Sequence, residues 1–210
     1  MRDDIAIAVV LLLALSGMGS PSAASSSPSG GRARARAVTW SDAELEAYAR
    51  ELGPIVSLEP YLSVLALESG LDPAASSGSA WGLNQAQGAL LFAAGWPSSP
   101  AAFGNLDVQQ QLPWIAKMLR RQINAIGYTP STAAELLRMQ LSPRAARDRS
   151  DVVFDARSDA TFYAANSWLD RNKTGRVTMA DLARELGAVE QQQRYRSHVE
   201  RLRALRRLLP

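Results

Sequence analysis

The chain has 210 residues, of which 47% are apolar and 20% are charged, a size and composition that suit one compact domain with appendages. It contains no cysteine, which excludes disulfides, thiolate nucleophiles and cysteine-ligated metal sites. It has a single histidine, which excludes a multi-histidine metal site. Any catalytic chemistry must therefore come from carboxylates, hydroxyls, amides and arginines.

The formal net charge of +3 is distributed unevenly. Residues 190–210 carry six arginines against two glutamates, and residues 25–37 carry three arginines and no acid. These two basic arms favour contact with a membrane surface or a virion through nonspecific attraction. A solvated arginine-rich surface is the alternative interpretation, and we expect no nucleic-acid partner.

The first 24 residues are typical of a secretory leader. Residues 5–15 form an apolar run of eleven residues, whereas a membrane-spanning helix needs about 20. Small residues follow, and 22–24 (Ser-Ala-Ala) is an acceptable cleavage site. We therefore predict a signal peptide or an uncleaved anchor over 1–24 and a Ser/Gly/Arg-rich linker over 25–37. Export follows from this interpretation, to the periplasm, the cell envelope or a virion.

The remaining sequence predicts a mainly α fold, because apolar residues recur at helical spacing and strand signals are weak. Ser41 and Glu44 form a capping-box pattern, and Asp107 and Thr178 are further candidate caps. Pro113 marks either a kink or a first turn. We expect one domain over 38–187 and a basic amphipathic helix over 188–210, with His198 at the surface. The predicted helices are 42–52, 57–69, 90–95, 108–126, 132–139, 159–168, 178–186 and 189–209.

Glu68 is the candidate catalytic residue. It continues the apolar stripe that Leu58, Tyr61 and Leu65 set along the second predicted helix. A carboxyl group held against apolar side chains resists ionisation, so its pKa rises, as a general acid near neutral pH requires. A glutamate that reaches solvent from the helix end is the alternative.

The sequence around Glu68 resembles a known family. Residues 68–74 read Glu-Ser-Gly-Leu-Asp-Pro-Ala, followed by Ser77 and then by Gly-Leu-Asn-Gln over 82–85. This pattern resembles the signature of the soluble lytic transglycosylases, lysozyme-like enzymes that cut peptidoglycan glycan strands. Residues 105–123, 130–144 and 160–187 are similar to later segments of the bacteriophage-type members. The resemblance implies a lysozyme-like helical domain, of the goose-type or lytic transglycosylase kind, with a long active-site cleft.

The same resemblance implies a function. Glu68 would act as the single general acid and base on the bond between N-acetylmuramic acid and N-acetylglucosamine, with peptidoglycan as partner and no required cofactor. An inactive peptidoglycan-binding module, or a structural module of a virion or secretion apparatus, is the alternative. Asn84 and the Tyr-Ala-Ala-Asn run over 163–166 depart from the family's usual residues. The implied substrate-binding residues are Ser77, Trp81, Asn84, Gln85, Tyr163 and Asn166.

Residues 170–181 fit the twelve-residue pattern of an EF-hand or dockerin-like loop, with Gly175 at the sharp turn. The sequence therefore raises the option of a bound calcium ion that stabilises the domain. Three basic residues lie within the pattern, so a relic loop with Thr178 as helix cap is the alternative. The candidate calcium ligands are Asp170, Asn172, Thr174, Arg176 and Asp181.

Overall fold

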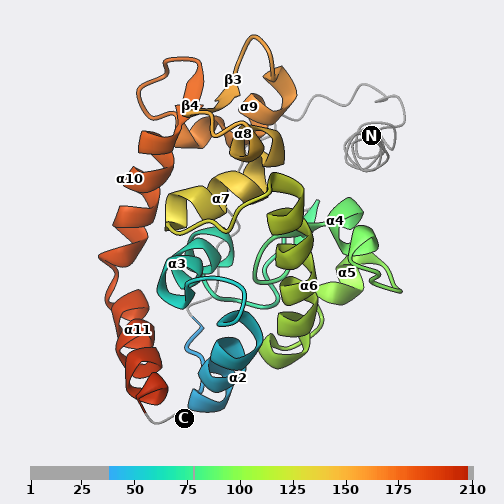
Figure 1. The fold of residues 1–210 in the computed structure, drawn as a ribbon, viewed down its shortest axis with the longest axis vertical. Helices are drawn as coiled ribbons and strands as arrows, with labels where there is room; N and C mark the ends of the chain where they lie inside the picture. The colour runs from blue at the N-terminus through green and yellow to red at the C-terminus, as the bar shows by residue number, and fades with distance from the viewer. Residues whose placement is uncertain (1–37, 78, 208–210) are drawn as a thin grey trace.

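The computed structural model describes residues 38–77 and 79–207 and shows a mainly helical domain, which confirms the predicted class (Figure 1). The described residues form ten α-helices, one short 3-10 helix and four short strands. The predicted leader and linker lie outside the described residues. The elements are α2 Asp42–Leu52, α3 Leu58–Ser69, β1 Ala80–Trp81, β2 Ala86–Gln87, α4 Gly88–Ala93, α5 Pro100–Phe103, α6 Val108–Ile126, α7 Ala133–Leu141, α8 Pro143–Arg147, β3 Val152–Asp155, α9 Ala160–Asn166, η1 Ser167–Leu169, β4 Arg176–Thr178, α10 Met179–Glu190 and α11 Gln193–Arg206.

Helix α3 lies at the centre of the core. It packs against α7, α10 and α11, while α2 packs against α6 and α11 (Figure 1). Tyr61, Leu62 and Leu65 of α3 are completely buried. A helix that is apolar on nearly every side needs partners on every side, and this arrangement supplies them.

Several helices begin at side-chain caps that the sequence predicted. Ser41 and Glu44 form the expected capping box at α2, with the Ser41 amide donating to Glu44 Oε2 at 2.6 Å. Asp107 caps α6, which continues through Pro113, so this proline is neither its first turn nor its end. Each box satisfies backbone N–H groups that have no partner within the helix.

The antiparallel pairs β1–β2 and β3–β4 were not predicted. The first closes the loop between α3 and α4, and the second joins α8 to α10. The predicted single helix over 189–209 is also wrong, because α10 continues to Glu190 and α11 begins only at Gln193. The break lets α11 turn onto α2 and α3.

His198 is completely buried, which corrects the predicted surface position. Its Nε2 accepts a hydrogen bond from the Trp40 amide at 2.9 Å, and its Nδ1 lies 2.8 Å from the Arg194 carbonyl oxygen. This geometry fixes the neutral ring with the proton on Nδ1. Arg201 donates to the Trp40 carbonyl at 2.7 Å, so α11 binds both polar backbone groups of Trp40.

This buried histidine predicts a loss of stability in mild acid. Burial, followed by the charges of Arg201 and Arg194, lowers the pKa of His198 below its ordinary 6.5 although the Arg194 carbonyl and Glu44 act in the opposite direction. As the pH falls, the unfolded chain therefore binds this proton at a higher pH than the folded protein does. The stabilisation is complete above pH 6.5 and is lost as the pH falls toward the lower pKa of the folded state. The slope is at most about 1.4 kcal/mol per pH unit.

Thermal unfolding of the protein and of His198→Gln, measured from pH 8 to pH 5, checks this expectation. The variant lacks the titrating ring and should show a flatter dependence between pH 6.5 and 5. The buried histidine has no such role if both proteins lose the same stability over that interval.

Candidate functional site

Glu68 lies in the last turn of α3 and is partly buried. The helix ends at Gly70, whose left-handed conformation (φ 65°) suits a residue without a side chain. Asp72 then stabilises the turn that follows, because its Oδ1 accepts from the Ala74 amide at 2.9 Å. This is the turn role that the Asp-Pro pair indicates.

A single buried glutamine holds the loop after α3 in place. Gln111 of α6 is 0% exposed. Its Nε2 lies within hydrogen-bond distance of the carbonyl oxygens of Pro73 (2.7 Å), Leu106 (3.0 Å) and Phe103 (3.2 Å). Its Oε1 accepts from the Leu83 amide at 2.9 Å. One side chain therefore ties α6 to both ends of the loop. Gln111 was not predicted as a site residue, because its only sequence signal is an amide on the apolar face of α6.

Gly82 is required at the centre of this loop. Its backbone has φ 77°, and a Cβ atom there would lie 2.5 Å from Gln111 Oε1 and 2.7 Å from the Phe103 ring. Any other residue would displace the glutamine or the ring, in addition to adopting an unfavourable conformation. The Gly-Leu-Asn-Gln run is therefore the segment that contacts Gln111.

The structure brings four of the predicted substrate-binding residues together in this loop. Ser77 is exposed, and its amide donates to the Ala80 carbonyl at 3.1 Å. Trp81 is partly buried against Gly104. Gln85 donates from Nε2 to the carbonyls of Ala75 and Gly82 at 3.2 and 3.0 Å. Since the loop begins directly after α3, these residues lie on the segment that follows Glu68.

Asn84 differs from its neighbours because it is only 6% exposed. Its Oδ1 is buried and has no hydrogen-bond partner among the residues that the structure describes. A buried amide oxygen without a donor is costly, so Asn84 does not stabilise the loop through this oxygen.

Tyr163 and Asn166 belong to a different part of the molecule. They lie on α9, which packs against β3, β4 and η1. The Tyr163 hydroxyl donates to Asp170 Oδ2 at 2.8 Å, and this bond raises the pKa of Tyr163. Asn166 donates back to the Phe162 carbonyl at 2.9 Å. Both polar groups are thus bonded within the 155–181 region.

The loop over 170–181 is organised around Asp170. Its Oδ1 accepts from the Thr174 amide at 3.1 Å and hydroxyl at 3.2 Å, and its Oδ2 accepts from Tyr163 and from the Gly175 amide, each at 2.8 Å. Desolvation opposes ionisation, but these donors outweigh it and lower the pKa of Asp170. Hydrogen-bond donors therefore surround the Asp170 carboxylate and stabilise its ionised form.

Of the remaining candidate calcium ligands, Asp181 and Arg176 are also engaged or cationic, and Asn172 is exposed. Asp181 accepts from Thr178 in the capping box of α10 and pairs with Arg184. Arg176 pairs with Asp155 at 2.8 Å. Within 38–77 and 79–207, no group of three or more acidic or histidine side chains lies close enough to hold a metal. In this arrangement the loop is closed by its own hydrogen bonds, and Arg176 brings a positive charge to it.

We accordingly expect that calcium leaves the protein unchanged. Addition of millimolar CaCl₂ to protein treated with a chelator should shift the melting temperature by no more than the same addition of MgCl₂. A calcium-specific rise that Asp170→Asn removes would contradict this expectation and support the calcium hypothesis.

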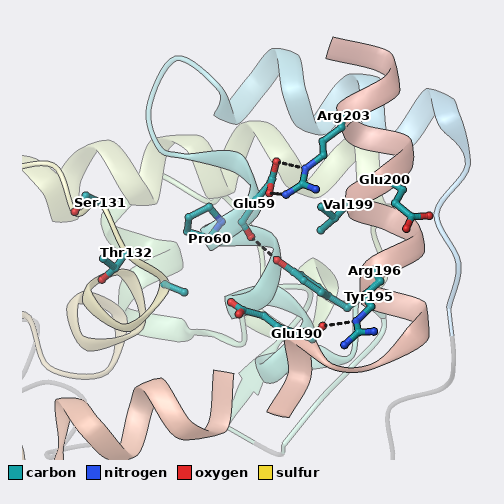
Figure 2. Close-up of a pocket in the computed structure, with 11 residues that line it drawn as sticks. Glu59, Pro60, Ser131, Thr132, Glu190, Tyr195, Arg196, Val199, Glu200 and Arg203 are labelled. Carbon is teal, nitrogen blue, oxygen red and sulfur yellow. Dashed lines mark hydrogen bonds and ion pairs between the residues drawn. The ribbon is translucent and has the colours of Figure 1, made fainter. Parts of the chain in front are cut away.

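A cavity of about 590 Å³ lies near the other end of α3 (Figure 2). Glu59 and Pro60, residues 131–133, and side chains of α11 line it. Arg203 binds both carboxylate oxygens of Glu59, at 2.8 and 2.6 Å, and its hydrogen bond lowers the pKa of Glu59. Burial and the charges of Glu190 and Glu59 raise the pKa of Tyr195 to about 12.

This cavity is separate from the predicted site. Glu59 and Glu68 are nine residues apart, which places them about 13 Å apart along the helix and on opposite sides of it. None of the predicted site residues lines the cavity. The sequence carried no signal for it, because its walls come from segments far apart in the chain.

Searches of protein-family models, of curated proteins and of solved structures found no match for this chain. The fold and the contacts of the described residues therefore carry the functional argument. They define a mainly helical domain in which a partly buried glutamate ends the central helix and a fixed loop follows it.

Proposed function

We propose that the protein is a peptidoglycan lytic transglycosylase of lysozyme-like fold, with Glu68 as its single general acid and base. The observation that carries the proposal is the position of Glu68, which ends a buried apolar helix directly before a loop fixed by Gln111. An acid needs partial desolvation to retain its proton, and it needs a rigid neighbour to position a substrate. The sequence resemblance supplies the substrate class.

In the proposed reaction, Glu68 donates its proton to the glycosidic oxygen as the bond from C1 to that oxygen breaks. The substrate's own acetamido oxygen stabilises C1, so no second carboxylate is required. The Glu68 carboxylate then takes the proton of the 6-hydroxyl group while that oxygen bonds to C1. The products are a 1,6-anhydro end and a new chain end, and Glu68 regains its proton.

Ser77, Trp81 and Gln85 are proposed to bind the glycan strand, since they lie on the loop that follows Glu68. The Trp81 ring would pack on a sugar face, and the Ser77 hydroxyl is exposed for hydrogen bonding. Asn84 would contribute through its unpartnered oxygen only if the loop opens. Tyr163 and Asn166 would reach the strand only after release from Asp170 and Phe162.

Digestion of purified peptidoglycan followed by mass analysis of the soluble products tests this function. The proposal expects anhydro products, which are lighter than hydrolysed products by one water. Hydrolysed products would still support a glycosidase, but one in which water attacks C1 in place of the 6-hydroxyl group. The absence of any soluble product would contradict the enzymatic function.

An inactive module of the same fold that binds peptidoglycan or builds a virion or secretion apparatus is the second candidate. The observation that favours it is that the amide groups of Gln85 and Asn166 donate to nearby backbone carbonyls. Cosedimentation with insoluble peptidoglycan, without release of soluble products, is the result that this candidate expects.

Export to the periplasm, the envelope or a virion belongs to the same proposal, because peptidoglycan is an extracytoplasmic substrate. The predicted leader lies outside the described residues. Among the residues that are described, no helix has the length and apolar character needed to cross a bilayer. The arginines of α11 are proposed to favour an anionic surface; Arg201 and Arg203 already pair with Asp42 and Glu59.

A further inference from the structure

The turn that ends α3 has a strained backbone. Gly70 and Leu71 both adopt left-handed conformations, with φ 65° and 68°, so α3 stops within two residues of Glu68. This conformation is unfavourable for leucine, because its Cβ atom crowds the following carbonyl oxygen. Such strain persists only where the surrounding structure imposes it, and it is common beside functional groups.

Trp40 forms the hydrogen bond that holds the Leu71 carbonyl. Its indole Nε1 donates to this oxygen at 2.9 Å. Trp40 and Leu71 are both completely buried, so water does not replace this bond in the folded protein. Two residues further on, Gln111 holds the Pro73 carbonyl at 2.7 Å. The segment that follows Glu68 is therefore tied to Trp40 first and to α6 next.

Trp40 is itself held by α11 and α2. His198 accepts from its amide at 2.9 Å, and Arg201 donates to its carbonyl at 2.7 Å. The Tyr48 ring of α2 packs on the indole with ring centroids 5.6 Å apart, and Arg201 also pairs with Asp42 at the start of α2. The two helices thus fix the indole, and the indole fixes the turn.

We propose that Trp40 is a positioning residue for Glu68, through which α11 fixes the turn between the proposed acid and the loop that follows it. The inference rests on the proposed function, because a general acid must be held at a set distance from the bound glycosidic oxygen. Trp40 is buried, so it acts through Leu71 and does not touch the glycan strand. With Gln111 it fixes the angle between the end of α3 and the loop.

Trp40→Phe tests this role, because it keeps an aromatic ring in the core and removes the N–H donor. Native-state hydrogen exchange of the full chain measures the result at the two ends of α3. The amides of Gly70 and Asp72 bond to carbonyls at the turn, and the Tyr61 amide bonds near the start of the helix. Exchange at Gly70 and Asp72 should rise about tenfold more than at Tyr61, the factor that corresponds to one lost buried hydrogen bond.

Tyr48→Phe is the matched control, because it removes a buried hydrogen bond at the other end of the same helix. Tyr48 is completely buried, and its hydroxyl donates to the Leu58 carbonyl at 2.7 Å. This variant should lower the melting temperature by an amount comparable to Trp40→Phe. Exchange at Gly70 and Asp72 should rise no more than exchange elsewhere in α3.

Arg201→Met keeps the proposal testable if Trp40→Phe does not fold. It removes the donor to the Trp40 carbonyl and leaves the indole in place, so exchange at the turn should rise by a smaller factor. Arg203→Met is its control, since Arg203 lies two residues further along α11 and pairs with Glu59 at the start of α3. It should leave exchange at the turn unchanged.

Hydrogen exchange separates this inference from the proposed function because it needs no turnover. Faster exchange confined to the turn in Trp40→Phe and Arg201→Met, but not in the two controls, supports the positioning role even if the protein cuts no peptidoglycan. An equal change at both ends of α3, or no change, overturns it even if the protein is an active enzyme.

The kinetics of an active enzyme supply a second readout, measured well below the melting temperature of every variant. In Trp40→Phe the kcat should fall about tenfold or more while KM stays within about twofold, because the acid is misaligned and Gln111 still holds the loop. Tyr48→Phe should keep both constants. An unchanged kcat in Trp40→Phe would also overturn the inference, since a tryptophan that only stabilises the fold leaves the folded enzyme fully active.

Discussion

Glu68→Gln is expected to abolish peptidoglycan cleavage while the protein stays folded. The amide has nearly the shape of the carboxyl group but can neither donate a proton to the glycosidic oxygen nor remove one from the 6-hydroxyl. Loss of general acid catalysis alone costs about 10²–10⁴-fold in rate, and here the same group would also act as the base. Zymography on purified peptidoglycan should therefore show no clearing, with a melting temperature close to that of the unchanged protein.

Glu59→Gln is the matched control, because it removes a carboxylate from the same helix. Glu59 lies at the opposite end of α3 and pairs with Arg203. This partly exposed pair contributes on the order of 1 kcal/mol or less, so the variant should fold and clear the gel normally. Clearing that persists in Glu68→Gln would contradict the proposed mechanism. Loss of clearing in both variants would show that the assay reports stability rather than catalysis.

The longer helices were predictable because their signals are local, whereas the short helices α5 and α8 were not predicted. The capping residues Ser41, Asp107 and Thr178 each stand beside the turn that they cap, and the structure confirms all three. The apolar stripe that ends at Glu68 is likewise visible in the sequence from the spacing of four residues along one helix. Such patterns depend on neighbours along the chain, which a sequence displays directly.

The missed elements depend on contacts between distant residues. The β1–β2 pair has two residues in each strand, which is too short to show alternation. The burial of His198 depends on Trp40, which lies 158 positions away. Similar reasoning applies to Tyr163, because its hydrogen bond to Asp170 depends on the path of the loop that follows η1.

The candidate site was therefore predictable in part. The sequence placed Glu68 at the end of a buried helix and placed Ser77, Trp81 and Gln85 in the following loop, and the structure has both features. It did not reveal the residue that holds the loop to α6. Nor did it reveal Trp40, which bonds to Leu71 from 31 positions away.

Gln111→Leu is expected to lower the free energy of unfolding by about 3–4 kcal/mol and to reduce cleavage even though Glu68 is intact. Leucine has a similar volume, so the packing loss is small. The variant leaves the buried Leu83 amide and the part-buried carbonyl oxygens of Pro73 and Leu106 without this partner, whereas the Phe103 carbonyl keeps the Leu106 amide as a donor. A buried group without a hydrogen bond costs about 1–3 kcal/mol, and partial movement of the loop toward water offsets some of the sum.

Gln109→Leu makes the same chemical change on an exposed turn of α6 and should alter stability by about 0.5 kcal/mol or less. Chemical denaturation of both variants measures the difference. If Gln111→Leu unfolds within about 1 kcal/mol of Gln109→Leu, the loop is held by something other than this side chain. In that case a loop held by Gln111 does not position the substrate beside Glu68. We expect a large loss of stability in Gln111→Leu and normal folding and cleavage in Gln109→Leu. This result would connect the rigidity of the loop to the activity of Glu68.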